Sequence, residues 1–281
     1  MSIRIPTGEK LVTYGGGVNS VALLELLRRL GVVPRAIVMS DPGHEWPETL
    51  RYRDAVLRPW LRRIGFPEVV VVSRESEAAH RPRSQHVGTL GDECMSKRML
   101  PSVAYPPHKK CSLKYKRDPQ LWWAERQRWV YEEVASGQRI VKCIGFDAGE
   151  DHRIKPSFAD ATEALLCVPW YPLYEAGLER ADCIRLIEQA GLPVPRKSAC
   201  TFCPNNTFED WSTLRAQHPR LFAYAVEMSR RAERHLENPD SVGLMRGCMP
   251  AGRRQLHVWA QENCSDHVGD GEPAVPCECA D

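Results

Sequence analysis

Three consecutive glycines followed by two polar residues are the clearest anion-binding candidate in this chain of 281 residues. The segment Gly15-Gly16-Gly17-Val18-Asn19-Ser20 follows a short apolar run and leads into apolar residues at helical spacing. Glycines let the backbone turn tightly and approach an anion, and a helix N-terminus behind them offers free N–H groups. We therefore predict a phosphate-binding turn, with Asn19 and Ser20 as side-chain donors. The alternative is a plain turn between a strand and a helix.

The 11 cysteines include a closely spaced pair and three that lie in apolar or helical stretches. Their odd number and the absence of an apolar signal core at the N-terminus predict reduced thiols in a cytoplasmic protein. The segment Cys200-Thr201-Phe202-Cys203-Pro204 has the spacing with which two thiolates bind one metal, although a lone CxxC leaves zinc, a redox pair and an iron–sulfur cluster open. Three others lie in apolar or helical stretches and are predicted to be core residues: Cys143, Cys167 and Cys183.

The elements that must position these residues alternate between strands and helices. Apolar runs predict strands at residues 11–14, 36–40, 69–73 and 140–146, and helical spacing predicts helices at 20–30, 46–64, 121–136, 180–190 and 211–236. This order predicts an α/β fold with a doubly wound parallel sheet and a mostly helical C-terminal part. Residues 74–116 are predicted to be irregular. No run reaches the roughly 18 apolar residues of a membrane helix, and a net charge of +2 gives no general attraction to membranes or nucleic acids.

We predict three parts along the chain: a nucleotide-binding domain at 1–175, a helical region with the CxxC motif at 176–262, and a flexible tail at 263–281.

The glycine segment resembles the PP-loop motif Ser-Gly-Gly-x-Asp-Ser of the adenine nucleotide alpha-hydrolase-like superfamily. That superfamily includes ATP pyrophosphatases, tRNA thiolation enzymes and sulfonucleotide reductases. The resemblance implies a sheet of the HUP or PP-loop type and a bound adenine nucleotide, ATP first among them, with Mg²⁺ as a further candidate. Two positions depart from the motif: Gly15 replaces the first Ser, and Asn19 replaces the Asp. Both changes bear on the handling of phosphates and Mg²⁺.

Two later segments resemble the phosphoadenosine phosphosulfate (PAPS) reductase-like branch of this superfamily. Residues 40–49 resemble its Asp-Thr-Gly-x-x-x-Pro-Glu-Thr segment, and residues 145–153 resemble Gly-x-Arg-x-x-Glu-Ser-x-Arg with Asp147 in place of the first Arg. Losing this cation weakens the expectation of a PAPS substrate. The resemblance implies a catalytic group of Asn19, Ser20, Glu150 and Arg153. The nucleotide-binding residues that it implies are Gly15, Gly16, Gly17, Asn19, Ser20, Asp41, Gly43 and Glu48.

The cysteine segments also match this branch. Lys110-Cys111-Ser112-Leu113-Lys114 resembles its Cys-Cys-x-x-x-Lys segment with Lys110 in place of the first Cys. The resemblance implies a [4Fe–4S] cluster on Cys111, Cys200 and Cys203, with Cys94 or an open iron position completing it, and zinc is the alternative. The lysines around Cys111, which include Lys109, Lys114 and Lys116, favour the thiolate form. They form either a solvated loop or an anion-binding lid that reaches RNA phosphates.

Three functions stay open on the sequence. In the first, ATP adenylates an oxygen of an acceptor, a tRNA base or a small metabolite, and sulfur from a donor, delivered through the cluster, then displaces AMP. In the second, APS or PAPS is reduced, with Cys279 of the tail segment Glu278-Cys279 as nucleophile and thioredoxin as partner. In the third, the chain is a non-catalytic nucleotide- or RNA-binding iron–sulfur sensor. A homodimer is compatible with each function, because the sequence does not determine the oligomeric state.

Overall fold

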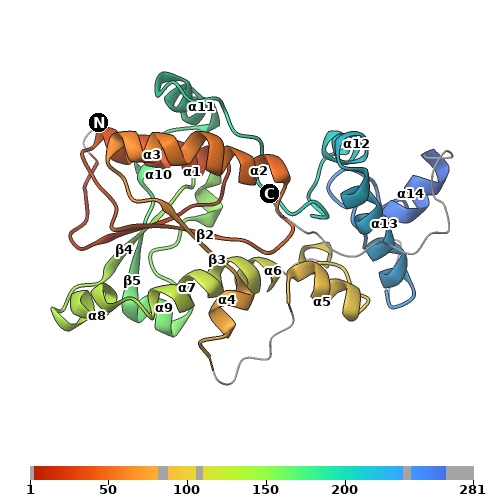
Figure 1. Ribbon diagram of the computed structural model, residues 1–281, viewed down its shortest axis with the longest axis horizontal. Coiled ribbons are helices and arrows are strands. Elements are labelled where there is room, and N and C mark those ends of the chain that lie inside the picture. The colour runs from red at the N-terminus through yellow and green to blue at the C-terminus, as the bar shows by residue number, and fades with distance from the viewer. Residues whose placement is uncertain (1–2, 82–87, 106–109, 237–241, 264–281) are drawn as a thin grey trace. The chain divides into compact units, whose positions relative to one another are not determined.

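The computed structural model describes residues 3–81, 88–105, 110–236 and 242–263 (Figure 1). It forms two compact units. The first comprises Met1–Thr89 and Ser112–Cys200, and the second comprises Leu90–Cys111 and Thr201–Asp281. The domain boundaries at 175/176 and 262/263 stay predictions. Lys109 and all of the predicted flexible tail after Asn263, with Cys279, lie outside the described residues.

The first unit contains a five-stranded parallel sheet in the order β3-β2-β1-β4-β5. The central strand β1 pairs with β2 through Val12 and Ile37 on one side, and with β4 through Val12 and Cys143 on the other. Because the chain winds outward in both directions from β1, the sheet is doubly wound, which confirms the predicted fold class. The strands are β1 (Lys10–Thr13), β2 (Ala36–Ser40), β3 (Val69–Val72), β4 (Ile140–Ile144) and β5 (Cys167–Trp170).

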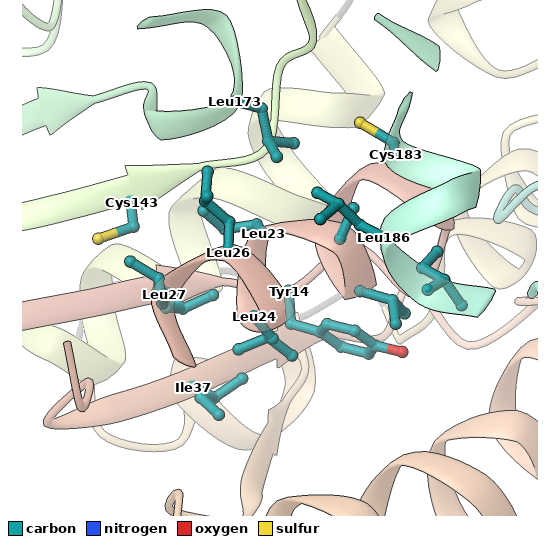
Figure 2. Close-up of a cluster of buried hydrophobic side chains, with 14 of the residues drawn as sticks. Tyr14, Leu23, Leu24, Leu26, Leu27, Ile37, Cys143, Leu173, Cys183 and Leu186 are labelled. Carbon is teal, nitrogen blue, oxygen red and sulfur yellow. The ribbon is translucent and has the colours of Figure 1, made fainter. Parts of the chain in front are cut away.

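Each face of the sheet carries its own hydrophobic cluster. On one face α1, α3, α10 and α11 cover side chains such as Ile37 and Val141, and Figure 2 shows α1 leucines packed between strand and helix side chains. On the other face α7, α8 and α9 cover Leu11, Val38 and Ile140 (Figure 1). Cys143 and Cys183 lie in the first cluster and Cys167 in the second, as predicted. Burial raises the pKa of the Cys167 thiol to about 11 and that of Cys183 to about 12.

Some elements of the first unit agree with the sequence prediction and others do not. A continuous helical stretch begins at Pro47, as predicted. The helix expected at 121–136 is two separate helices, and the strand β5 was not predicted. The helices are α1 (Val18–Arg29), α2 (Pro47–Tyr52), η1 (Arg53–Leu57), α3 (Arg58–Ile64), α4 (Arg74–Ala78), η3 (Leu113–Arg117), α7 (Asp118–Ala124), α8 (Arg128–Ala135), η4 (Ala148–Arg153), α9 (Ala161–Leu166), α10 (Pro172–Glu175) and α11 (Arg180–Gln189).

The described part of the second unit is helical. Its central helix α13 packs against α12, α14 and α5, and the predicted break near Pro219 is confirmed because α12 ends just before it. The prediction of irregular structure at 74–116 was wrong, since short helices form there; α4, for example, is capped by the Ser73 side chain. The elements are α5 (Leu90–Ser96), η2 (Ser102–Ala104), α12 (Phe208–Gln217), α13 (Pro219–Glu233) and α14 (Leu256–Asn263), with α6 (Lys110–Ser112) across the division.

None of the helices in the described ranges is both long enough and apolar enough to cross a membrane.

Candidate functional site

The glycine segment forms the turn between β1 and α1. Gly16 has a φ of +82°, and a Cβ at this position would lie 2.5 Å from Cγ2 of Thr49, so only glycine fits. Gly17 is the N-cap of α1, and it is extended and has no side chain to bond the first-turn N–H groups. The first turn of α1 also holds no acidic residue. The positive end of this helix is therefore left open for an anion.

A cavity of about 620 Å³ opens in front of this turn, inside the first unit. It lies at the carboxyl ends of β1 and β4, where the winding of the sheet reverses and open α/β folds bind ligands. Of the described lining residues, six are Lys or Arg and two are Glu, so the wall favours an anionic ligand. The charged residues are Lys116, Arg117, Lys142, Arg153, Arg180, Lys197, Glu150 and Glu163.

Asn19 of α1 connects charged groups of two other elements, η4 with its N-cap residue and α11, at the rim of this cavity. Its Nδ2 donates to Asp147 Oδ2 at 2.9 Å and to Glu150 Oε2 at 3.0 Å, and its Oδ1 accepts from Arg180 Nη1 at 2.9 Å. Carboxylates only accept and guanidinium only donates, so these partners fix the orientation of the amide. The arrangement holds Glu150 and Arg180 toward the glycine turn.

Arg153 is held flat against an aromatic pair. Its guanidinium carbon lies 3.8 Å from the centroid of the Phe146 ring, which stacks on Tyr171 at 5.7 Å. Arg153 also bonds Glu150. The structure thus brings together four residues predicted from the sequence to be catalytic, Asn19, Ser20, Glu150 and Arg153, because all of them line the cavity.

Glu45 connects the cavity wall to the CxxC segment within the first unit. Its Oε1 accepts from the Ala199 backbone N–H at 2.6 Å, its Oε2 lies 3.7 Å from Lys116 Nζ, and Glu45 and Cys200 form an antiparallel β-bridge. The side chain is 1% exposed, and burial raises the pKa of this carboxyl. Lys116 lines the cavity, so one carboxylate orients both a cavity cation and the backbone beside Cys200.

The other predicted nucleotide-binding residues follow β2, with Asp41 and Gly43 in a loop and Glu48 in the first turn of α2. Asp41 accepts from the Gly43 backbone at 2.7 Å, and Glu48 lies 3.6 Å from Arg196. None of Asp41, Gly43 and Glu48 is among the described lining residues of the cavity. Gly15 and Gly17 line it, while Gly16 shapes the turn behind them. A nucleotide-binding role for Asp41, Gly43 and Glu48 stays a prediction.

The four cysteines predicted to bind metal fall on both sides of the division between the units. Cys200 belongs to the first unit, and Cys94, Cys111 and Cys203 to the second. Cys94 and Cys200 are buried, whereas Cys111 and Cys203 are half-buried, and all four are free of disulfides. Within the described residues, no three His, Cys, Asp or Glu side chains form a group suited to a metal ion. The predicted cluster stays a prediction.

Several cavity residues were not predicted as site residues. Lys142 sits in an apolar strand and Glu163 in a short helix, far from any motif, so only the fold brings them to the cavity. Lys197 and Ser198 come just before the CxxC motif, and only the tertiary structure shows that Ser198 lies near the glycine turn, 3.5 Å from where a Cβ on Gly16 would stand. The unpredicted lining residues with polar side chains include Gln120, Lys142, Glu163, Arg180, Lys197 and Ser198.

The sheet and the cavity define an α/β fold with a cavity at its topological switch point. No protein-family model and no curated protein matches the chain. Among solved structures, the chain is similar to the U34-tRNA thiolase NcsA from Methanococcus maripaludis, described with its [4Fe-4S] cluster. The identity is 11%, the TM-score is 0.35, and the match covers 92% of this chain and 81% of the thiolase chain. The fold class stated here rests on the strand order and pairing of this sheet.

Proposed function

We propose that the chain is an ATP-dependent enzyme that activates an acceptor for sulfur transfer. The observation that carries the proposal is the N-terminus of α1, which has no side-chain cap and faces the cavity. Of the charged residues that line this cavity, six are cationic and two are anionic. Such a site suits a polyphosphate, because backbone N–H groups and cations both stabilise its charge. The resemblance of residues 15–20 to a PP-loop makes ATP the first candidate.

In the proposed reaction an acceptor oxygen attacks the α-phosphorus of ATP and releases pyrophosphate, and a sulfur nucleophile then displaces AMP. The turn at residues 15–20 holds the pyrophosphate. Arg153 and Arg180 neutralise charge that develops on the phosphates, and both are already oriented by protein contacts. Positioning and electrostatic stabilisation account for most of the catalysis in this scheme.

An iron–sulfur cluster is part of the same proposal. Cys111, Cys200 and Cys203 are proposed as ligands, with Cys94 or an open iron position as the fourth, and cysteine thiolates have the donor chemistry that a cluster requires. When bound, such a cluster would deliver sulfide from a sulfur donor to the activated acceptor. A tRNA base or a small metabolite is the proposed acceptor class.

Nucleotide binding is tested with paired substitutions on α11. Arg180→Gln removes a cavity cation, whereas Arg185→Gln removes an exposed arginine from the same helix. We expect Arg180→Gln to weaken binding of a non-hydrolysable ATP analogue about tenfold or more in calorimetry, since a charge-assisted bond is worth roughly 1.5–3 kcal/mol. Arg185→Gln should bind like wild type. Equal affinities for all three proteins would contradict the proposed site.

The cluster and the reaction class need separate assays. Anaerobic purification should give a brown protein with about four irons per chain, and Cys200→Ser should lose them. The core substitution Cys183→Ala is the matched control, because Cys183 packs among apolar side chains. Pyrophosphate release that depends on an acceptor supports adenylation. Sulfite release from APS or PAPS without ATP would replace it with sulfonucleotide reduction, and a zinc-loaded protein would remove the cluster.

A further inference from the structure

The two side-chain donors predicted for the glycine turn are both engaged by the protein itself. The hydroxyl of Ser20 donates to the backbone carbonyl of Gly17 at 2.8 Å. The amide of Asn19 donates to the carboxylates of Asp147 and Glu150. A hydroxyl has one hydrogen and an amide has two, so neither side chain keeps a hydrogen for an anion at the turn. A further side-chain donor for that anion must come from another segment.

Ser198 packs directly against the turn from a segment far along the chain, and it lines the cavity. A Cβ on Gly16 would lie 3.5 Å from both the Cβ and the Oγ of Ser198, and a Cβ on Gly17 would lie 3.6 Å from the Ser198 backbone nitrogen. Gly17 is the N-cap of α1. Ser198 therefore lies beside the end of α1 at which the unbonded first-turn N–H groups gather, and both belong to the first unit.

The hydroxyl of Ser198 is buried and has no hydrogen-bond partner among the residues that the structure describes. A buried hydroxyl without a partner costs free energy, and such groups are usually satisfied by a ligand or by water. The residue as a whole is half-buried, and a rotation about its Cα–Cβ bond turns the hydroxyl into the cavity. Because no protein hydrogen bond has to break, this change of rotamer meets little opposition.

Glu45 is the protein group that competes for this hydroxyl. Burial raises the pKa of the Glu45 carboxyl, while Lys116, the Ala199 N–H and Ser198 oppose the shift. No hydrogen bond joins Ser198 to this carboxylate, which already accepts from the Ala199 N–H at 2.6 Å. The hydroxyl of Tyr14 is also buried without a described partner, but the Tyr14 ring packs in the hydrophobic cluster that α1 covers (Figure 2). Ser198 thus keeps its hydrogen for a ligand beside the turn.

From these contacts we propose that Ser198 is a phosphate-binding residue of the glycine turn. Its hydroxyl donates to a phosphate oxygen that the first-turn N–H groups of α1 also hold, and Lys197, which lines the same cavity, adds positive charge. The assignment deepens the proposed function and rests on it for the identity of the ligand. In the proposed reaction the phosphate bound here leaves as pyrophosphate, so Ser198 stabilises charge on the leaving group.

The probe is inorganic pyrophosphate, and its binding to the full chain is measured by calorimetry. Ser198→Ala removes the hydroxyl and keeps the Cβ, so we expect a loss of about tenfold in affinity, because one hydrogen bond to a charged acceptor disappears. Ser198→Thr keeps a hydroxyl and should retain most of the affinity. Ser136→Ala removes an exposed serine that does not line the cavity, and this matched control should bind like wild type.

Urea denaturation separates a phosphate contact from a structural role. A phosphate contact predicts that Ser198→Ala leaves the free energy of unfolding near that of wild type and loses only pyrophosphate. If the hydroxyl instead supports Glu45, Ser198→Ala should be less stable and should bind pyrophosphate like wild type, and the inference is then wrong. Ser198→Gly takes the place of Ser198→Ala if circular dichroism shows that the alanine variant misfolds.

The remaining outcomes separate this inference from the proposed function. If Arg180→Gln weakens a non-hydrolysable ATP analogue and Ser198→Ala does not, the proposed function stands and the inference fails. If Ser20→Ala weakens pyrophosphate and Ser198→Ala does not, Ser20 is the donor that the sequence predicted. If wild type binds no pyrophosphate, the inference also fails. If Ser198→Ala loses pyrophosphate but wild type binds no ATP analogue, the phosphate site stands and the ATP-dependent function fails.

Discussion

The side-chain amide of Asn19 donates a hydrogen bond of 2.9 Å to the carboxylate of Asp147. These are two of the positions at which the sequence departs from the motifs that it resembles, with Asn in place of Asp and Asp in place of Arg. An Asp at position 19 would face the carboxylates of Asp147 and Glu150 at hydrogen-bond distance. The two departures are therefore physically coupled, because the neutral amide at position 19 is what tolerates an acid at position 147.

Asn19→Asp should weaken nucleotide binding. It places three carboxylates together at the rim and turns a donor into an acceptor, so we expect a loss of about tenfold or more in affinity for a non-hydrolysable ATP analogue. Calorimetry measures it, with Asn19→Ala as the variant that loses the bonds without adding charge. Asn19→Asp should bind more weakly than Asn19→Ala.

Both positions can also be returned to the residue types of the motifs that they resemble, Asp at position 19 and Arg at position 147. Asn19→Asp/Asp147→Arg restores an acid–base pair and should recover most of the lost affinity. It also removes the bond from the Gly149 N–H to Asp147, so a stability loss of about 1 kcal/mol is expected. If the double variant binds as weakly as Asn19→Asp alone, the coupling between these positions does not exist.

Gly16→Ala should destabilise the first unit more than an ordinary glycine substitution. Its φ of +82° strains any L-residue, and the new Cβ would meet the buried side chain of Thr49 at 2.5 Å. We expect a loss of roughly 2–4 kcal/mol in the free energy of unfolding, measured by urea denaturation. Gly31→Ala is the control, because Gly31 has a φ of +67° with no heavy atom within 4 Å of the added Cβ. It should lose only about 1 kcal/mol, and an equal loss at both positions would rule out the steric contact.

The sequence predicted those elements that short runs of neighbouring residues determine. The strand at Ala36–Ser40 and the turn at residues 15–20 were predicted because an apolar run and three glycines each carry a clear signal. The strand β5 was not predicted, since it is short and carries Pro169 at an edge of the sheet. The helices at 74–116 were hidden by Pro, Gly and basic residues around them.

The candidate site was predictable only in its glycine turn and its rim. Lys142 lies within an apolar run, where a lysine gives no signal of its own, and its partner Glu163 is 21 positions away on another element. Gln120 is one polar residue on a helix that also carries Leu121. Sequence spacing cannot show that such residues share a cavity, because their proximity depends on strand order and on which face each residue occupies.

Glu45 accepts a hydrogen bond from the Ala199 backbone N–H, and a glutamine at position 45 should keep this bond. Glu45→Ala leaves the Ala199 N–H without its acceptor at 2.6 Å, and we expect a loss of about 1–3 kcal/mol in the free energy of unfolding. Glu45→Gln keeps an oxygen for this bond and gives up only the charge opposite Lys116. Its loss should be less than half of that in Glu45→Ala. Equal losses in urea denaturation would show that the charge, and not the backbone bond, is what matters.

His257 should make the stability of the second unit depend on pH. It is 5% exposed, its Nδ1 lies 2.9 Å from Ser229 Oγ, and its Nε2 lies 3.2 Å from Glu233 Oε2. Burial lowers the pKa of this imidazole, and Arg230 lowers it further, while Glu233 opposes the shift. The folded state thus takes up a proton less readily than the unfolded state, whose histidine titrates near pH 6.5, roughly its ordinary value.

The sign of the effect follows from this difference. Below about pH 6.5 the unfolded state binds the extra proton first, so stability falls with decreasing pH until the folded-state pKa is reached, and it is fully present above pH 6.5. Urea denaturation of the full chain should show this loss between about pH 7 and 5. His257→Gln removes the titrating group and should flatten the curve in this window. An unchanged pH slope in His257→Gln would assign the dependence to other groups.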